Sequence, residues 1–300
     1  MRLDSGRFTV VAYPADRQLA DTLLRAALAR DSFPGLSRPR ARVLLMVAPD
    51  ERRFREWVGP NAPEWGAAIA FPQSGRIVMQ GRTAGSDAGD PLVVLRHELA
   101  HLALHEALGD LPTRWFDEGY ASYAAGEWSR DETLATNIAL ALRGMPTLEE
   151  LEDGFVHGAG QAEASYALAY RAVAELAALD PARGLSLFLS YWKESGRFDT
   201  AVRRAYGITA AAFEKRWRER TRRRFGGLAL FADVTLSTLV FLGILLPLYV
   251  TRRRRDRRRM EALVRADADA ERRAREQSAL DALLGVPPVA GPSPGDERSG

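Results

Sequence analysis

Hydrophobic positions in the first third of the chain follow patterns typical of strands. FTVVAYP (residues 8–14) and ARVLLMVAP (41–49) are short apolar runs rich in β-branched residues, as expected for strands buried in a sheet. The stretch between them, residues 16–30, has the spacing of an amphipathic helix. AAIAFPQSGRIVMQ (67–80) holds two apolar runs around a turn at 72–75, which predicts a hairpin.

The next part of the chain, residues 90–224, shows almost only helical periodicity. Asp90 and Pro91 suit the cap and the first turn of a helix, and Gly109 suits its end. A second helix is expected to begin near Trp115 and to fold back on the first.

The longest apolar run, LALFADVTLSTLVFLGILLPLYV at residues 228–250, carries one charge. At about 1.5 Å per residue a helix of this length spans roughly 34 Å, enough for a hydrocarbon core of about 30 Å. It predicts one C-terminal transmembrane helix, followed by a charged, partly disordered tail at 251–300. Ahead of it we expect an α+β fold: a small mixed sheet with helices in residues 1–89, then a mainly helical subdomain in 90–224.

Positive charge gathers on both sides of the apolar run. Of 42 Lys and Arg residues, seven lie in 215–224 and seven in 252–259, while the net charge of the chain is only +3. Basic clusters around an apolar segment suit anionic lipid headgroups, so we expect a membrane partner and no nucleic acid. Because the chain has no cysteine, any metal site must use His, Asp and Glu. The oligomeric state is not indicated by the sequence.

The orientation in the membrane follows from the denser basic run, RRRRDRRR, which lies after the apolar segment. It favours a cytoplasmic tail and places residues 1–227 outside the cytoplasm. The opening, MRLDSGRFTVVAYP, contains no apolar export segment. Either a signal peptide precedes Met1, or the protein is tail-anchored with its main domain in the cytosol.

Candidate chemistry lies in LRHELAHLALHEALGD, residues 95–110. His97 and His101 are four residues apart, so both imidazoles project from one helix face and can bind one ion. Glu98, rotated by about 100° from His97, can reach a water held by that ion. His105 lies about 12 Å along the helix axis from His97, so we place it outside the ligand set, beside the site or on the surface.

A third ligand is expected in RWFDEGYASYAAGEW, residues 114–128. If this second helix packs against the histidine helix, Glu118 lies opposite His97 and His101. The alternative is that Asp117 and Glu118 are charges that complement the dipole at a helix N-terminus.

HELAH followed by WFDEGYASY resembles the gluzincin metallopeptidases, most closely the bacterial peptidase MA-like family. The resemblance covers roughly residues 8–224. It implies a Zn²⁺ held by His97, His101 and Glu118, and hydrolysis of a peptide or protein substrate by zinc-activated water with Glu98 as general base. It further implies a tyrosine that donates to the oxyanion, and Tyr166 matches that position, with Tyr170 as the alternative.

The resemblance also implies that an extended substrate pairs with a sheet edge, for which SGRIVMQG, residues 74–81, is the candidate; the alternative is that these residues form an ordinary sheet strand. Thermolysin-like members carry an aspartate that orients a ligand histidine where this chain has Ser122. Which group performs that task here is left open, with Asp117 as a candidate. No G-x-M-E-N motif precedes the histidine helix, and removal of single N-terminal residues is therefore not expected. The alternative function is a non-catalytic zincin-like module that binds a peptide or an envelope component.

Overall fold

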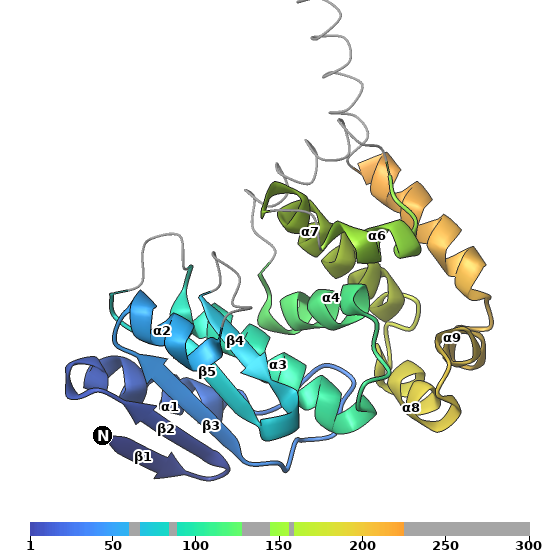
Figure 1. Ribbon diagram of the computed structural model, residues 1–300. Helices are drawn as coiled ribbons and strands as arrows, with labels where there is room; N and C mark the ends of the chain where they lie inside the picture. Colours follow the sequence, from blue (N-terminus) through green and yellow to red (C-terminus); the bar gives the residue numbers. More distant parts are fainter. Residues whose placement is uncertain (60–66, 84–88, 128–144, 156–158, 225–300) are drawn as a thin grey trace, which may run out of the picture. The chain divides into compact units, whose positions relative to one another are not determined.

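The computed structural model describes residues 1–59, 67–83, 89–127, 145–155 and 159–224. The chain divides into two compact units, Met1–Asp233 and Val234–Gly300, and every described residue belongs to the first (Figure 1). The predicted transmembrane helix, residues 228–250, and the tail, 251–300, lie outside the described residues. Within the described ranges no helix is both long and apolar enough to cross a membrane.

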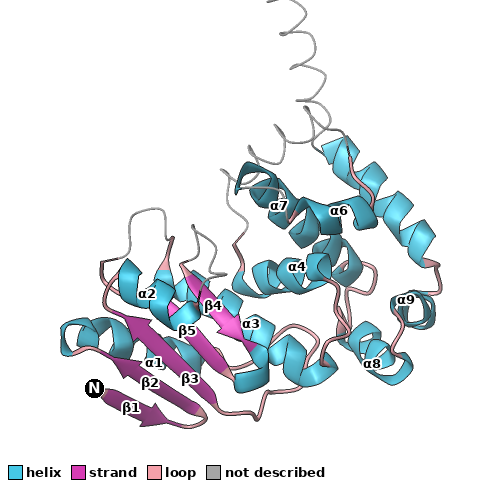
Figure 2. Cartoon of the chain, in the orientation of Figure 1, coloured by secondary structure: helices cyan, strands magenta, loops and turns pink. Residues whose placement is uncertain are grey.

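The fold is α+β, with a small mixed sheet in the N-terminal part and helices after it, as predicted (Figure 2). The strands are β1 (Arg2–Ser5), β2 (Phe8–Ala12), β3 (Val43–Ala48), β4 (Ala68–Phe71) and β5 (Arg76–Gln80). The main helices are α1 (Arg17–Ala29), α2 (Glu51–Val58), α3 (Pro91–Leu108), α4 (Arg114–Ala125), α6 (Leu148–Gly154), α7 (Ala159–Ala177), α8 (Ser186–Ser195) and α9 (Phe198–Tyr206). A last helix is described over residues 210–224.

The order of the strands in the sheet is β1-β2-β3-β5-β4. β2, β3 and β5 run parallel, while β1 and β4 pair antiparallel with β2 and β5 at the two edges. The predicted hairpin is present, and the short 3-10 turn η2 (Pro72–Ser74) connects its strands. At the end of η2, Gly75 adopts a φ of 59° and a Cβ there would lie 2.6 Å from the carbonyl oxygen of Arg42, so this turn requires glycine.

The strand proposed as the sheet edge, residues 74–81, is an interior strand, so the prediction of an edge is wrong and the alternative, an ordinary sheet strand, is confirmed. β5 pairs with β3 on one side and with β4 on the other. The hairpin adds β4 outside β5, and β4 is therefore the edge strand that faces the helical part of the chain, where it contacts α3.

Different helices pack on the two faces of the sheet. α1 and α3 lie on one face, where the main hydrophobic core includes Val10, Leu45 and Ile77 and continues through the helices after the sheet. The short helix α2 covers the other face, where Phe54 packs on Val78. Neither β1 nor α2 was predicted: β1 has four residues with alternating exposure, and α2 has few apolar positions.

Candidate metal centre

α3 presents the histidine pair. Asp90 caps this helix by accepting a hydrogen bond from the backbone N–H of Leu92, Pro91 occupies its first turn, and Gly109 ends it, as predicted. Eight of the eighteen residues of α3 are buried, and the side chains of His97 and His101 keep 13% and 12% of their surface exposed. The pair lies on a part of the helix that lines a cavity.

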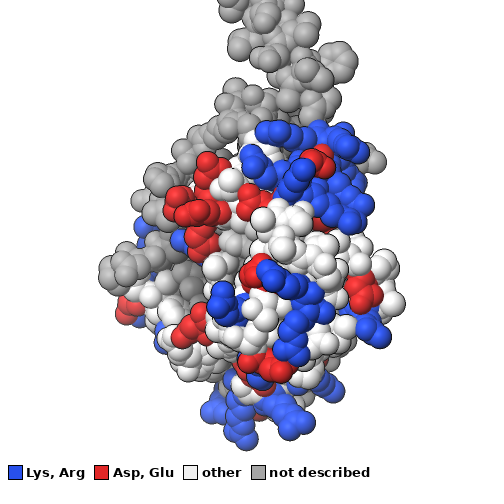
Figure 3. All heavy atoms as spheres, turned by 90° about the vertical axis from the view of Figure 1, so that its right-hand side faces the viewer, with Lys and Arg blue, Asp and Glu red and all other residues white. Residues whose placement is uncertain are grey.

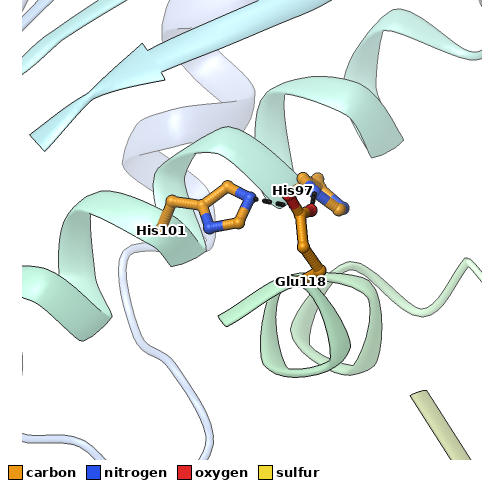
Figure 4. A group of neighbouring side chains, drawn as sticks. All are labelled: His97, His101 and Glu118. Atoms are coloured by element: carbon orange, nitrogen blue, oxygen red, sulfur yellow. Dashed lines mark ion pairs between the residues drawn. The ribbon is translucent and has the colours of Figure 1, made fainter. Parts of the chain in front are cut away.

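α4 brings Glu118 to the same point. α4 packs against α3, and Glu118 projects from it between the two imidazoles (Figure 4). Its Oε2 atom lies 3.5 Å from Nε2 of His97 and 3.5 Å from Nε2 of His101. One ligand atom from each of the three residues lies within 4.8 Å of the other two. The structure thus brings together the three residues predicted to hold a metal.

The donor types of this group, and two of its three donor separations, suit a tetrahedral ion such as zinc. Donor atoms at about 2.0–2.1 Å from a tetrahedral ion lie about 3.3 Å apart, close to the 3.5 Å separations between Glu118 Oε2 and the two Nε2 atoms. Two imidazoles and one carboxylate, with no thiolate, form the donor set of catalytic zinc sites, which keep a fourth position open. Such an ion would have His97, His101 and Glu118 as its ligands.

A carboxylate holds the far ring nitrogen of each histidine. His101 Nδ1 lies 2.7 Å from Asp117 Oδ1, and His97 Nδ1 lies 2.7 Å from Glu127 Oε1. When Nδ1–H donates to a carboxylate, the Nε2 lone pair is left for a metal and the ring is fixed in orientation. Asp117, the candidate named for orienting a histidine, thus contacts His101.

Glu127 was not predicted from the sequence. It follows Gly126, the residue with a φ of 73° at the C-terminus of α4. The left-handed turn at this glycine directs the chain back toward His97. The available signal was an acidic residue directly after a helix-ending glycine, two turns beyond Glu118.

His105 lies outside the group of three, as the rise of the helix predicts. Its Nε2 atom is 3.1 Å from Asp117 Oδ2, and its Nδ1 atom is 3.7 Å from Asp110 Oδ1. Asp117 therefore accepts from His101 with one oxygen and contacts His105 with the other. His105 supports the carboxylate that orients His101.

Opposite charges in this cluster shift the pKa values of its members strongly. Burial alone would lower the pKa of His97, but the charge of Glu127 and hydrogen bonds to Glu118 and Glu127 raise it to about 10. The pKa of His101 is likewise raised well above its ordinary value, against the effect of burial, by Asp117 and Glu118. Burial opposes ionisation of Glu118, but hydrogen bonds to both histidines hold its pKa far below the usual range.

Glu98 lies next to the histidine pair and is buried. Burial raises the pKa of its carboxyl group, although the charges of His97 and His101 and a hydrogen bond from the backbone of Ala70 in β4 counteract this. The side chain thus reaches from α3 toward the edge strand rather than toward Glu118.

A cavity of about 670 Å³ opens in front of these groups. It is lined by residues 68–74 of β4 and η2, by His97, Glu98, His101 and His105 of α3, by Arg114, Asp117 and Glu118 of α4, and by Tyr166 of α7. Of the two candidate tyrosines, Tyr166 therefore lines the cavity. The ring of Tyr170 packs near that of Tyr123, at 6.0 Å between centroids, and Tyr170 is not among the lining residues.

Comparison of the chain with known proteins identifies the family to which this region belongs. A search of curated proteins found no match to the chain. The family model of the Peptidase MA superfamily matches residues 59–222, which include β4, the histidine pair, Glu118, Glu127 and Tyr166. Because that match spans more than half of the 300 residues, the chain belongs to the Peptidase MA superfamily.

Proposed function

We propose that this chain is a zinc-dependent metallopeptidase that is anchored to a membrane by its C-terminal segment. The observation that carries the proposal is the convergence of His97, His101 and Glu118 at the wall of a cavity that also contains Glu98. A structural zinc site would be closed by four protein ligands and would need no adjacent carboxylate in an open cavity. The combination supports hydrolysis rather than metal binding for stability alone.

Zinc bound by these three side chains would supply a Lewis acid that polarises the peptide carbonyl and lowers the pKa of water. Glu98 acts as general base. Its carboxylate takes one proton from water as the water oxygen forms a bond to the carbonyl carbon, and it then delivers this proton to the amine nitrogen as the C–N bond breaks. The raised pKa of Glu98 suits a group that must hold the proton between the two steps.

Tyr166 is proposed to donate a hydrogen bond to the oxyanion that develops on the carbonyl oxygen. Burial and the nearby charge of Glu118 raise the pKa of its phenol. The hydroxyl group therefore keeps its proton near neutral pH and remains a donor. Its place in the lining of the cavity supports this assignment over Tyr170.

We propose that the substrate binds as an added strand beside β4 rather than beside β5. β4 is an edge strand, and its residues line the cavity next to Glu98. An edge strand offers unpaired backbone groups that can bind an extended peptide. The Ala70 backbone, which donates to Glu98, places this edge within reach of the proposed base.

Membrane anchoring is supported by the apolar segment at 228–250 and by the helix that precedes it. Lys and Arg side chains gather along residues 210–224, in the upper part of the face in Figure 3. Arg216 and Arg220 pair with Glu175, whereas Lys215, Arg222 and Arg223 are exposed. If the proposal holds, the full chain stays in the membrane pellet after alkaline carbonate extraction; release into the supernatant contradicts anchoring.

We further propose that the catalytic unit faces the extracytoplasmic side and the tail faces the cytoplasm, with the tail-anchored cytosolic arrangement as the alternative. The denser basic run after the apolar segment supports this orientation. Protease added to intact cells should degrade the catalytic unit. Protection of that unit until the cells are lysed would favour the cytosolic alternative.

Hydrolysis is tested with the purified full chain and an unfolded protein as substrate. We expect cleavage that stops when a chelator removes the metal and returns when about one equivalent of zinc is added. Tight binding of one zinc without cleavage of the unfolded protein or of a diverse peptide library would favour the non-catalytic binding module instead.

A further inference from the structure

Arg114 is the first residue of α4, and its side chain lines the proposed catalytic cavity. It is the only Arg or Lys among the described residues that line this cavity. Its side chain is 49% exposed, and its Nε atom lies 4.0 Å from Glu118 Oε1. A fixed positive charge thus stands at the cavity wall, one helical turn from a proposed metal ligand.

The main chain at Arg114 is firmly held. Glu152 of α6 accepts hydrogen bonds from the backbone N–H groups of Arg114 and Trp115, both at 2.8 Å. The guanidinium group also lies near the ring of Phe155, 5.5 Å from its centroid. The backbone of Arg114 therefore has a defined position, from which the side chain extends along the cavity wall.

The guanidinium group itself remains available for a ligand. Its separation of 4.0 Å from Glu118 exceeds the length of a hydrogen bond, and an ion pair at such an exposed position contributes little. Among the described contacts the guanidinium makes no hydrogen bond, because the one bond that Arg114 donates comes from its backbone. Its planar N–H groups therefore have open positions on the cavity side.

Apart from Glu118 Oε1, the carboxylate oxygens nearby are directed at other groups. Asp117 and Glu127 face the Nδ1 atoms of the two histidines, and Glu98 accepts from the backbone of Ala70. Glu118 Oε2, the oxygen in the group of three, faces both Nε2 atoms. The charge of Arg114 is therefore only weakly compensated, by Glu118 Oε1 at 4.0 Å from its Nε atom, and the half-exposed guanidinium can be approached by a peptide in this cavity.

We propose that Arg114 binds a carboxylate of the peptide substrate, so that the site prefers peptides with a carboxylate near the scissile bond. A guanidinium group binds carboxylates with two parallel charge-assisted hydrogen bonds. The carboxylate comes either from an Asp or Glu side chain or from the substrate C-terminus. The inference rests on the proposed function, since it assumes that peptides bind in this cavity.

The test measures peptide binding without cleavage, using the full-length Glu98→Gln variant loaded with zinc. Three fluorescent peptides of equal length are compared by anisotropy: one with Glu and an amidated C-terminus, one with Gln and a free C-terminus, and one with Gln and an amidated C-terminus. We expect the peptide with the preferred carboxylate to bind about 10- to 100-fold more tightly than the neutral peptide, as for a hydrogen bond to a charged group. The first two peptides distinguish the two sources of the carboxylate.

Arg114→Gln in the same background should remove this preference, and Arg114→Lys should keep part of it. Arg114→Glu should favour a peptide with Lys at the same position, a gain that misfolding would not produce. Arg55→Gln is the matched control: Arg55 is 51% exposed and pairs with Glu51 four residues away, but it does not line the cavity. It should leave the preference unchanged.

Equal affinities for the three peptides would overturn the inference, as would a preference that survives in Arg114→Gln. An equal loss of affinity for all three peptides in that variant would also overturn it, because Arg114 would then bind the peptide backbone. Failure of the proposed function is a separate result: the wild-type chain would bind the acidic peptide through Arg114 and cleave none. Absence of binding by every peptide would contradict both.

Discussion

Two carboxylates on the far side of the histidine pair determine how the imidazoles are presented. Asp117 and Glu127 each lie 2.7 Å from an Nδ1 atom, and both Nε2 atoms consequently face Glu118. Such contacts fix the tautomer and increase the basicity of a ligand histidine. We therefore expect metal affinity to depend on residues that do not contact the metal.

Glu127 provides the first test at the residue scale. Glu127→Gln keeps the size of the side chain but removes the negative charge that orients His97, and we expect zinc affinity to fall by about 10- to 100-fold. Competition with a chromophoric chelator measures the change. Glu194→Gln, which removes a carboxylate paired with Arg204 on the surface, should have no effect. Equal affinities for Glu127→Gln and the wild type would show that Glu127 does not support the site.

Zinc binding should also depend on pH. Without metal, Glu127 and Glu118 raise the pKa of His97 to about 10, and the pKa of His101 is raised as well, so the protonated form of each imidazole is favoured in the metal-free site. Coordination requires the neutral form, and binding must therefore release protons. Affinity should fall as the pH is lowered from about 10. Calorimetry in buffers of different ionisation enthalpy measures the release; a binding enthalpy independent of buffer would contradict it.

Most of the proposed site can be predicted from local sequence, because a helix fixes the positions of residues three and four apart. The four-residue spacing of His97 and His101 is enough to place both on one face of α3, and the same helical rise excludes His105. Placing Glu118 and Asp117 near the histidines required only the further assumption that the second helix packs on the first. Glu127 depends on the turn at Gly126, a tertiary feature that helical spacing does not predict.

At the scale of the elements, α4 depends on a close approach to α7. A Cβ atom at Gly119, directly after Glu118, would lie 2.5 Å from the carbonyl oxygen of Ala169. Only glycine permits the two helices to approach so closely. α7 also carries Tyr166, and this contact therefore fixes the distance between the proposed ligand and the proposed oxyanion donor.

Gly119→Ala tests that contact. Alanine favours a helix over glycine by about 1 kcal/mol, but overpacking against a backbone carbonyl costs about 1–3 kcal/mol. We expect a lower free energy of unfolding in chemical denaturation and a weaker zinc affinity. The control is Gly154→Ala, where the new Cβ would meet the side-chain hydroxyl of Ser165 rather than a backbone carbonyl. A stability for Gly119→Ala equal to or above the wild type would show that the helices can separate without cost.

The sequence predicts the individual elements that line the site but not the order of the strands. The hairpin, α3 and α4 have strong local signals, namely a turn between two apolar runs, helix caps and helical periodicity. The order of the strands has no local signal in the sequence, because the position of β4 outside β5 depends on which strand pairs with β3. The pairing of β5 with β3 determines which backbone lies near Glu98. For this reason the strand proposed to bind the substrate is β4 and not β5.

At the scale of the whole molecule, the sheet and the helices after it share one hydrophobic core. The cavity lies where these two parts meet, between β4 on one side and α4 and α7 on the other. The α+β class and the order of its two parts follow from the change in hydrophobic periodicity near residue 90. The predicted membrane segment, 228–250, lies outside the described residues and stays a prediction.

The central claim is that His97, His101 and Glu118 hold a zinc ion at which Glu98 acts as the base. The most direct test compares the wild-type chain with Glu98→Gln, measuring zinc content and cleavage of an unfolded protein on the same samples. We expect about one zinc per chain in both and cleavage only in the wild type, with a loss of at least about 100-fold in kcat, as for removal of a general base. Cleavage by Glu98→Gln at the wild-type rate, with zinc retained, would contradict the assignment of the base and with it the proposed mechanism.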